Sequence, residues 1–162
     1  MDIFSSVKDI MIKKVLTVTP DAPLIEAINY LLEKDISGLP VLDKDRRVVG
    51  IITEYDIATK GSLADLATYV RLIQEYRAHN KQGQEEKSIF ESIKRISATA
   101  VRTVMNSDPL VLKQDASVNE AVQTFIEHHR VNPIPIVDDG GRLVGILSRH
   151  DLIKLFYTSR YG

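Results

Sequence analysis

The chain has no cysteine among its 162 residues, which excludes disulfide cross-links, thiolate zinc sites and cysteine nucleophiles. It has almost no excess charge, because 21 Lys and Arg stand against 22 Asp and Glu. No global positive field would therefore attract nucleic acid or an anionic membrane. The sequence also lacks an uninterrupted run of 18 apolar residues, the length that a membrane-spanning helix needs, and its first residues contain no apolar run of the length expected for a signal peptide. We expect a soluble, cytoplasmic protein that neither binds nucleic acid nor inserts directly into a membrane.

Motifs of common catalytic and cofactor sites are missing as well. There is no Gly-x-Gly-x-x-Gly pattern, no Walker sequence and no nucleophile elbow. Four histidines are present, but His128 and His129 are adjacent and cannot share one face of a helix. Nucleotide hydrolysis would need a positioned base or a set of metal ligands, and the sequence offers neither. We therefore expect no enzyme, no metal and no required cofactor.

A tandem repeat is the main feature that the sequence does contain. A shift of 94 positions carries Val7–Met11 onto Val101–Met105, and a shift of 95 carries Gly50–Asp56 onto Gly145–Asp151. One extra residue in the second copy accounts for the change of shift. A match over about fifty positions with one insertion indicates a duplicated unit, and such a unit decides the fold.

Both copies show the same order of expected elements, β-α-β-β-α. A short extended segment and a turn precede a stretch with apolar residues at positions i, i+3, i+4 and i+7, which is typical of an amphipathic helix. Two strands joined by a turn follow, and a hydroxyl residue then begins a last short helix. The expected strands are residues 15–18, 39–42 and 48–52 in the first copy, and 110–112, 134–137 and 143–147 in the second.

This pattern predicts a mixed α/β (α+β) fold. Each copy alone has too little core, so we expect the two sheets to pack against each other about a pseudo-two-fold axis, with two related clefts between the copies. We divide the chain into a first repeat at 1–59, a helical insert or linker at 60–100, and a second repeat with a C-terminal tail at 101–162. The insert is longer than joining two packed repeats requires. It forms either a helical hairpin on its own module or a surface for a dimer or another partner.

The motif Gly-apolar-apolar-Thr/Ser-x-x-Asp ends each copy, at Gly50–Asp56 and Gly145–Asp151. One interpretation is local, because a hydroxyl residue followed three positions later by an acid forms a capping box at a helix start. The other is a binding site. The first turn of a helix attracts anionic groups, a carboxylate accepts both hydroxyls of a ribose, and the apolar strand residues Ile51 and Ile146 provide a surface for a purine. Duplication of the motif favours the binding site.

These segments resemble cystathionine-β-synthase (CBS) domains, and the tandem is similar to the CBS pair called a Bateman module. The resemblance rests on Ser37–Asp43 and Asn132–Asp138 together with the two copies of the motif, and it covers about 7–58 and 101–155. It implies a regulatory module that binds AMP, ADP, ATP or S-adenosylmethionine. It also implies pairing into homodimers that regulate an enzyme, channel or transporter.

The resemblance also implies roles for individual residues. Asp56 and Asp151 would bind the ribose, and Thr53 and Ser148 would lie near the phosphate. The base would be lined by the backbone around two segments, one containing Ile36 and Gly38 and the other Val131 and Pro133, and by the strand starts at Thr17 and Val111. Pro133 stands where the first copy has Gly38 and removes one backbone donor.

The two expected sites differ beside the hydroxyl residue. Glu54 follows Thr53, whereas Arg149 and His150 follow Ser148. A carboxylate repels a triphosphate, whereas arginine can donate two hydrogen bonds to phosphate oxygens. We therefore expect the Ser148/Asp151 cleft to bind a nucleotide more tightly and the first cleft to be weaker, empty or suited to S-adenosylmethionine. The alternative is a dimerisation or interaction scaffold that works without any ligand.

Overall fold

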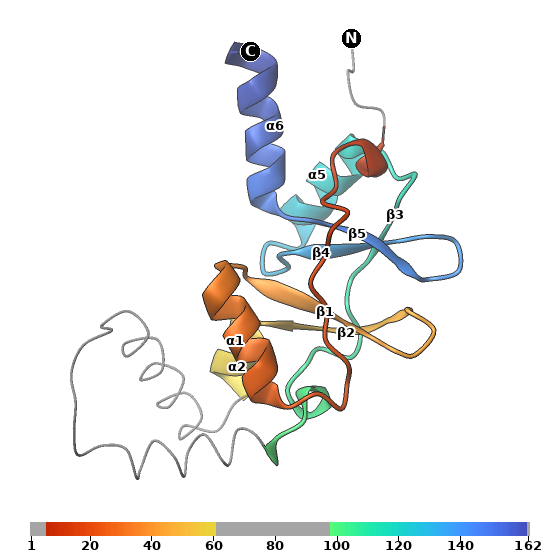
Figure 1. Ribbon diagram of the computed structural model, residues 1–162. Helices are drawn as coiled ribbons and strands as arrows, with labels where there is room; N and C mark the ends of the chain where they lie inside the picture. The colour runs from red at the N-terminus through yellow and green to blue at the C-terminus, as the bar shows by residue number, and fades with distance from the viewer. Residues whose placement is uncertain (1–5, 61–97, 162) are drawn as a thin grey trace, which may run out of the picture.

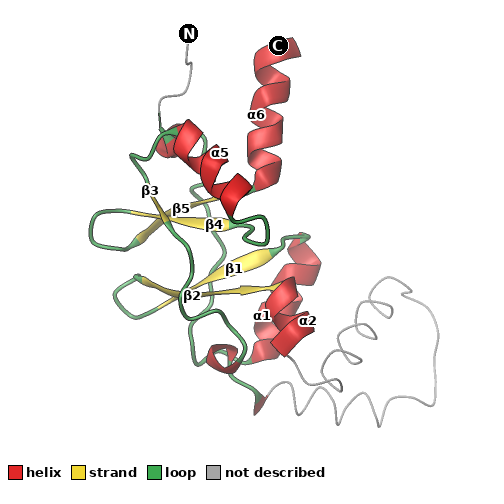
Figure 2. Cartoon of the chain, turned by 180° about the vertical axis from the view of Figure 1, so that it is seen from behind, coloured by secondary structure: helices red, strands yellow, loops and turns green. Residues whose placement is uncertain are grey.

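Two antiparallel hairpins form the centre of the molecule (Figure 1). The computed structural model describes residues 6–60 and 98–161. The first hairpin consists of β1 (Gly38–Leu42) and β2 (Val48–Thr53), and the second of β4 (Ile134–Val137) and β5 (Leu143–Leu147). The two sheets lie next to each other with helices on their outer sides (Figure 2). The predicted α/β fold of two packed repeats is confirmed.

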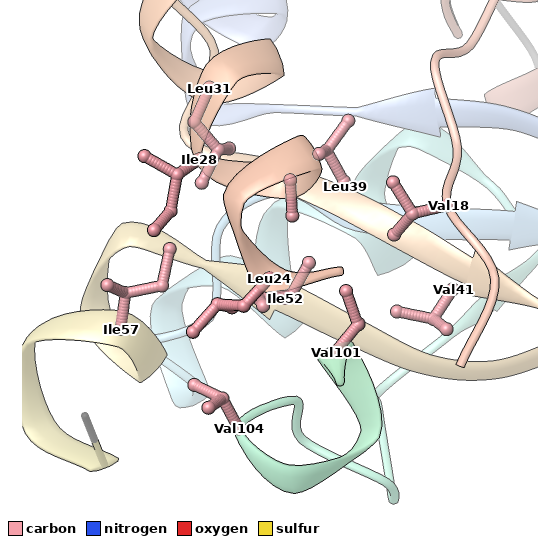
Figure 3. Packing of buried hydrophobic residues seen from close by; sticks show 11 residues of the cluster. Val18, Leu24, Ile28, Leu31, Leu39, Val41, Ile52, Ile57, Val101 and Val104 are labelled. Atoms are coloured by element: carbon pink, nitrogen blue, oxygen red, sulfur yellow. The ribbon is translucent and has the colours of Figure 1, made fainter. Parts of the chain in front are cut away.

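Among residues 6–60 and 98–161, four α-helices cover the sheets, two in each repeat. They are α1 (Leu24–Lys34), α2 (Glu54–Lys60), α5 (Val118–Glu127) and α6 (Arg149–Tyr161). One face of α1 is buried, and Figure 3 shows Leu24, Ile28 and Leu31 packing over Leu39 and Ile52 of the first sheet. Burial of this face against the sheet stabilises the helix more than its intrinsic propensity does.

The first strand of each repeat is shorter than the sequence suggests. In the first repeat the extended segment makes one parallel bridge, from Val18 to Val41. In the second it forms β3 (Leu112–Lys113), which pairs in parallel with β4. The last helices also differ, because α2 is short as expected whereas α6 extends to Tyr161.

The leading segments of the two repeats are exchanged. The short 3-10 helix η1 (Val7–Asp9) precedes the first repeat, but Val7 is fully buried in the core of the second. The equivalent helix η2 (Val101–Thr103) carries Val101 into the core of the first. Figure 1 shows both segments lying beside the other repeat. Because each core is completed by the other half of the chain, the two repeats form one folding unit.

Matching hydrogen bonds and ion pairs fix the two exchanged segments. The Val7 amide donates to Ala116 at 2.8 Å, and the Val101 amide donates to Ala22 at 2.9 Å. Each segment also ends in an ion pair, Lys8 with Asp115 and Arg102 with Asp21. The hydrogen bond to Asp115, together with its negative charge, raises the pKa of Lys8. Asp115 and Asp21, which precede α5 and α1, therefore each hold the exchanged segment that comes from the other repeat.

A pseudo-two-fold axis relates the repeats, as expected from the duplication. At the hairpin tips, the Val48 amide donates to the Gly141 carbonyl at 3.2 Å and the Leu143 amide donates to the Arg46 carbonyl at 3.1 Å. These two bonds are equivalent under the repeat shift. The insert predicted at 60–100 lies mostly at residues 61–97, outside the described residues.

Candidate ligand site

Thr53 and Asp56 form a complete capping box where β2 passes into α2. The Thr53 backbone amide and hydroxyl both donate to Asp56 Oδ2, at 3.1 and 2.5 Å. The Asp56 amide returns a bond of 3.2 Å to Thr53 Oγ1. Asp56 is only 6% exposed, so these bonds replace the hydrogen bonds with water that the carboxylate loses on burial.

The second repeat carries the same arrangement at the start of α6. The Ser148 amide and hydroxyl donate to Asp151 Oδ2 at 2.9 and 2.6 Å, and the Asp151 amide donates to Ser148 Oγ at 3.2 Å. The local interpretation of the motif therefore holds in both copies. It uses one oxygen of each carboxylate and leaves the other, Oδ1, for a different partner.

Asp56 and Asp151 differ in the partner of their second carboxylate oxygen, Oδ1. Asp56 Oδ1 pairs with Lys60 Nζ at 2.8 Å, and the same ammonium donates to the Met105 carbonyl at 3.3 Å. Leu155 stands at the position equivalent to Lys60. Within the described part of the chain, Asp151 Oδ1 has neither a hydrogen-bond donor nor an ion-pair partner. The Oδ1 atom of Asp151 is thus an acceptor without a partner in the described part of the chain, whereas the Oδ1 atom of Asp56 is already engaged by Lys60.

Arg149 contacts the end of α5. Its Nη2 donates to the carbonyls of Phe125, His128 and His129 at 3.3, 3.2 and 2.6 Å, and the guanidinium lies 5.4 Å from the centre of the Phe125 ring. A cation at a helix C-terminus is favourable. The group that we predicted to contact phosphate is therefore already engaged, whereas His150 is exposed.

The two segments expected to line the base meet between the repeats. Gly38 and Pro133 are both buried, and a Cβ added to Gly38 would lie 2.7 Å from Pro133 Cδ and 3.0 Å from Thr53 Cγ2. Ile36 and Val131, at the start of the two segments, pack against the first and second cores. The structure therefore brings Thr53 together with both segments.

The remaining predicted residues lie along the strands. Thr17 is half-buried beside the Val18 bridge, and Val111 is 38% exposed just before β3. Ile51 is buried and Ile146 is half-buried. Each precedes a residue that packs under the helices, Ile52 or Leu147, so their side chains lie on the other face of the sheet. Their backbones pair with the exchanged segments, Ile51 with Asn106 and Ile146 with Ile12.

A pocket of about 420 Å³ lies at the other end of the first repeat. Its lining includes Thr17, Leu42, Asp43 and Arg46. Leu42 ends β1, whereas Gly38, which pairs with Thr53, begins it. At about 3.3 Å per residue the length of the strand separates this pocket from the capping box. The pocket lies between the hairpin tip and the segment that leads into α1.

The described residues form neither a metal-binding cluster nor a membrane-spanning helix. Over 6–60 and 98–161, no three His, Asp or Glu side chains are placed to hold a metal ion. None of the helices described in these two ranges combines the length and the apolar character needed to cross a membrane.

Sequence reasoning missed Lys60 and the contact between Ser37 and Asn132. The spacing of Asp56 and Lys60, i to i+4 on a helix, is a readable signal for an ion pair. Asn132 Nδ2 donates to Ser37 Oγ at 3.3 Å. No local signal predicts that contact, because the two residues are far apart in the sequence and meet only when the repeats pack against each other.

The fold and the paired capping boxes define a tandem-repeat module in which each repeat places the same hydroxyl–carboxylate pair at the start of its last helix. The CBS domain family model matches residues 7–62 and 101–158, and the chain belongs to this family. The resemblance seen in the sequence is thereby confirmed.

The chain aligns with nearly the full length of one relative but with only a small part of another. An uncharacterized protein of Methanocaldococcus jannaschii is 35% identical, with 91% of this chain and 89% of the relative aligned. Inosine-5'-monophosphate dehydrogenase of the same organism is 33% identical over 90% of this chain, but the chain spans only 22% of that enzyme.

Two solved structures share the fold. One is CBSX2 of Arabidopsis thaliana in complex with AMP, with a TM-score of 0.70, 24% identity, and 95% of this chain and 97% of that one covered. The other is the CBS domain pair of protein MJ0100 in complex with 5'-methylthioadenosine and S-adenosyl-L-methionine. Its TM-score is 0.64 at 24% identity, covering 94% of this chain and 99% of that one.

Proposed function

We propose that this chain is a regulatory, non-catalytic module that binds an adenosine-containing ligand beside Asp151, at the start of α6. The observation that carries the proposal is the second oxygen of Asp151, which meets no donor within the described residues. Ribose hydroxyls are donors, and a carboxylate oxygen is their natural acceptor. Asp151 is half-buried, so a ligand could reach it.

The ligand class is supported by what the fold neighbours hold. AMP is bound to CBSX2, and 5'-methylthioadenosine and S-adenosyl-L-methionine are bound to the pair of MJ0100. The group common to these three compounds is adenosine, and their remaining parts differ in charge. We infer that the ribose and the base provide most of the recognition in this chain.

The first turn of α6 is consistent with that emphasis. The Ser148 amide donates to Asp151, the Arg149 amide donates to Asn132 at 3.0 Å, and the Asp151 amide donates to Ser148. Three amides that could bind a phosphate are therefore already bonded within the protein. Free donors are what make a helix start a strong phosphate site, so a phosphate adds less here than the ribose does.

We also propose that the first cleft binds more weakly. Lys60 already neutralises Asp56, and a ribose hydroxyl would have to share that oxygen with an ammonium group. The site expected to bind more tightly is the same as in the sequence analysis, but the physical reason for the difference in affinity is another one. Lys60 now supports it, whereas Arg149 points to α5.

Isothermal titration with AMP, ATP and S-adenosylmethionine tests the proposal, using Asp151→Asn and the matched Asp56→Asn. The amide keeps one oxygen for the capping box but replaces the other with a donor that cannot accept from ribose. We expect Asp151→Asn to weaken the tighter binding event at least about tenfold, or 1.4 kcal/mol, and Asp56→Asn to change it less. Equal losses would contradict the asymmetry, and no heat with wild type would contradict the ligand class.

A scaffold that acts without a ligand is the second candidate function. Three large apolar residues on α5 and α6 are 64–69% exposed: Ile126, Ile153 and Tyr157. Such residues suit contact with a second copy or with a regulated enzyme or transporter. The double variant Asp56→Asn/Asp151→Asn separates the two functions. Light scattering after size-exclusion chromatography should show unchanged assembly, whereas any response of assembly or of a partner to ligand should disappear.

A further inference from the structure

Equivalent residues of the two repeats meet at the pseudo-two-fold axis, and one such pair lies between the starts of α2 and α6. Ser37 and Asn132 occupy the same position in their repeats. Asn132 Nδ2 donates to Ser37 Oγ at 3.3 Å, and Asn132 Oδ1 accepts from the Arg149 amide at 3.0 Å. One side chain of the second repeat thus touches the first repeat and the first residue of α6.

The orientation of the Asn132 amide is fixed by its neighbours. The Arg149 backbone amide can only donate, so it must face the oxygen of Asn132. The NH₂ group is then directed to Ser37, whose hydroxyl oxygen has lone pairs to accept the bond. A flipped amide would place two donors against each other and lose the bond.

The other end of the chain of bonds reaches α2. The Glu54 amide, at the first residue of α2, donates to the Ser37 carbonyl at 3.3 Å. Glu54, Ser37, Asn132 and Arg149 are therefore joined by three successive hydrogen bonds. They connect the helix start beside Thr53/Asp56 to the helix start beside Ser148/Asp151.

Tight packing holds this connection at a fixed length. Gly38 follows Ser37, and Pro133 follows Asn132. Both are buried, and a Cβ on Gly38 would meet Pro133 Cδ at 2.7 Å. Closely packed interiors transmit small displacements instead of absorbing them. A movement of Asn132 is therefore passed to the first repeat.

We propose that Asn132 is a positioning residue that couples the two clefts, so that filling one changes the affinity of the other. The inference rests on the proposed function for the identity of the ligand, but the coupling is a property of the bonds themselves. A ligand that shifts the first turn of α6 moves the Arg149 amide, and Asn132 transmits the change to Ser37 and Glu54. Linkage requires the effect to be equal in both directions.

Amide hydrogen exchange measured by NMR tests the connection without any ligand. Ser37→Ala removes the anchor of Asn132 but touches neither Asn132 nor Arg149. We expect it to speed exchange of the Arg149 amide about fivefold, the lower end of typical coupling between sites. Asn119→Ala, which replaces an exposed asparagine of α5, should leave it unchanged, and the Leu147 amide should show that the fold is intact. An Arg149 amide that is unaffected by Ser37→Ala overturns the proposal.

Titration with AMP then tests the coupling between the clefts. In an Asp56→Asn background, so that the second cleft is filled first, the Arg149 and Glu54 amide signals should shift with the same midpoint. Adding Asn132→Ala should abolish the Glu54 shift and retain the Arg149 shift. A Glu54 shift that survives Asn132→Ala overturns the coupling. No shift at Arg149 with AMP or S-adenosylmethionine overturns the proposed function instead, and the exchange experiment then decides the connection by itself.

Discussion

At the scale of single residues, the glycine that begins each repeated motif has a packing role. A Cβ on Gly50 would lie 2.6 Å from Met105 Sδ and 3.0 Å from the Asn106 carbonyl. On Gly145 it would lie 2.7 Å from Met11 Cγ and 3.1 Å from the Ile12 carbonyl. In both cases the neighbour is the exchanged segment. The glycines therefore let a backbone from the other repeat lie directly against the strand.

Gly145→Ala should consequently destabilise the whole protein. A methionine side chain can move aside, but the Ile12 backbone is held by two hydrogen bonds of 2.9 Å to Ile146. We expect a loss of about 1–3 kcal/mol, the usual cost of overpacking a core, measured by urea denaturation. Gly140→Ala, at an exposed turn, is the control. A similar loss in both variants would contradict this explanation of the motif glycine.

At the scale of elements, the pattern of apolar residues predicted an amphipathic helix before each hairpin, as α1 and α5 show. It also predicted the strands of both hairpins to within about two residues, the usual uncertainty of element ends. These elements are decided locally, by periodicity and turns. The sequence did not reveal what ends α5. Its start is capped by Ser117, which accepts from the Glu120 amide, but its last carbonyls are bonded by Arg149 from another helix. That partner is distant in sequence, so no local signal identifies it.

Arg149→Met separates the two roles considered for this residue. Loss of the guanidinium removes its bonds to the three carbonyls, of which that of His128 keeps a bond of 2.9 Å from the Val131 amide. We expect a loss of about 1–2 kcal/mol of stability, as for other helix-end interactions. Affinity for ATP should fall no more than affinity for AMP. Arg130→Met, an exposed cation nearby, is the matched control. A selective loss of ATP binding with unchanged stability would restore the phosphate contact expected from the sequence.

At the scale of the whole molecule, the exchange of leading segments links the two cores. The motif residues Thr53, Asp56, Ser148 and Asp151 were found from the repeat alone, because each capping box is local. The exchange of the leading segments was not predicted, because the sequence of each repeat taken alone suggests that Val7 and Val101 pack within their own repeats. The different surroundings of Asp56 and Asp151 could have been predicted in part, because the i to i+4 spacing of Asp56 and Lys60 is visible in the sequence.

Val7→Ala should therefore weaken both repeats although it changes the core of only the second. Val7 is fully buried there, and we expect a loss of about 1–3 kcal/mol for shortening a buried valine. Hydrogen exchange of the Ile52 and Leu147 amides should accelerate together, and urea unfolding should remain a single transition. Exchange that accelerates at Leu147 alone, or two separate transitions, would show that the repeats unfold independently.

The pair formed by Ser37 and Asn132 also bears on what duplication made possible. Two separate copies of a single repeat could form the same exchanged arrangement as a symmetric dimer, but a residue on the axis would then always face its own kind. Joining the copies in one chain removes that restriction, and the two sides of the axis can change independently. With serine on one side and asparagine on the other, the contact at the axis has a donor side and an acceptor side, which a symmetric dimer could not have had. The first repeat supplies an acceptor, and the second supplies the group that connects it to α6.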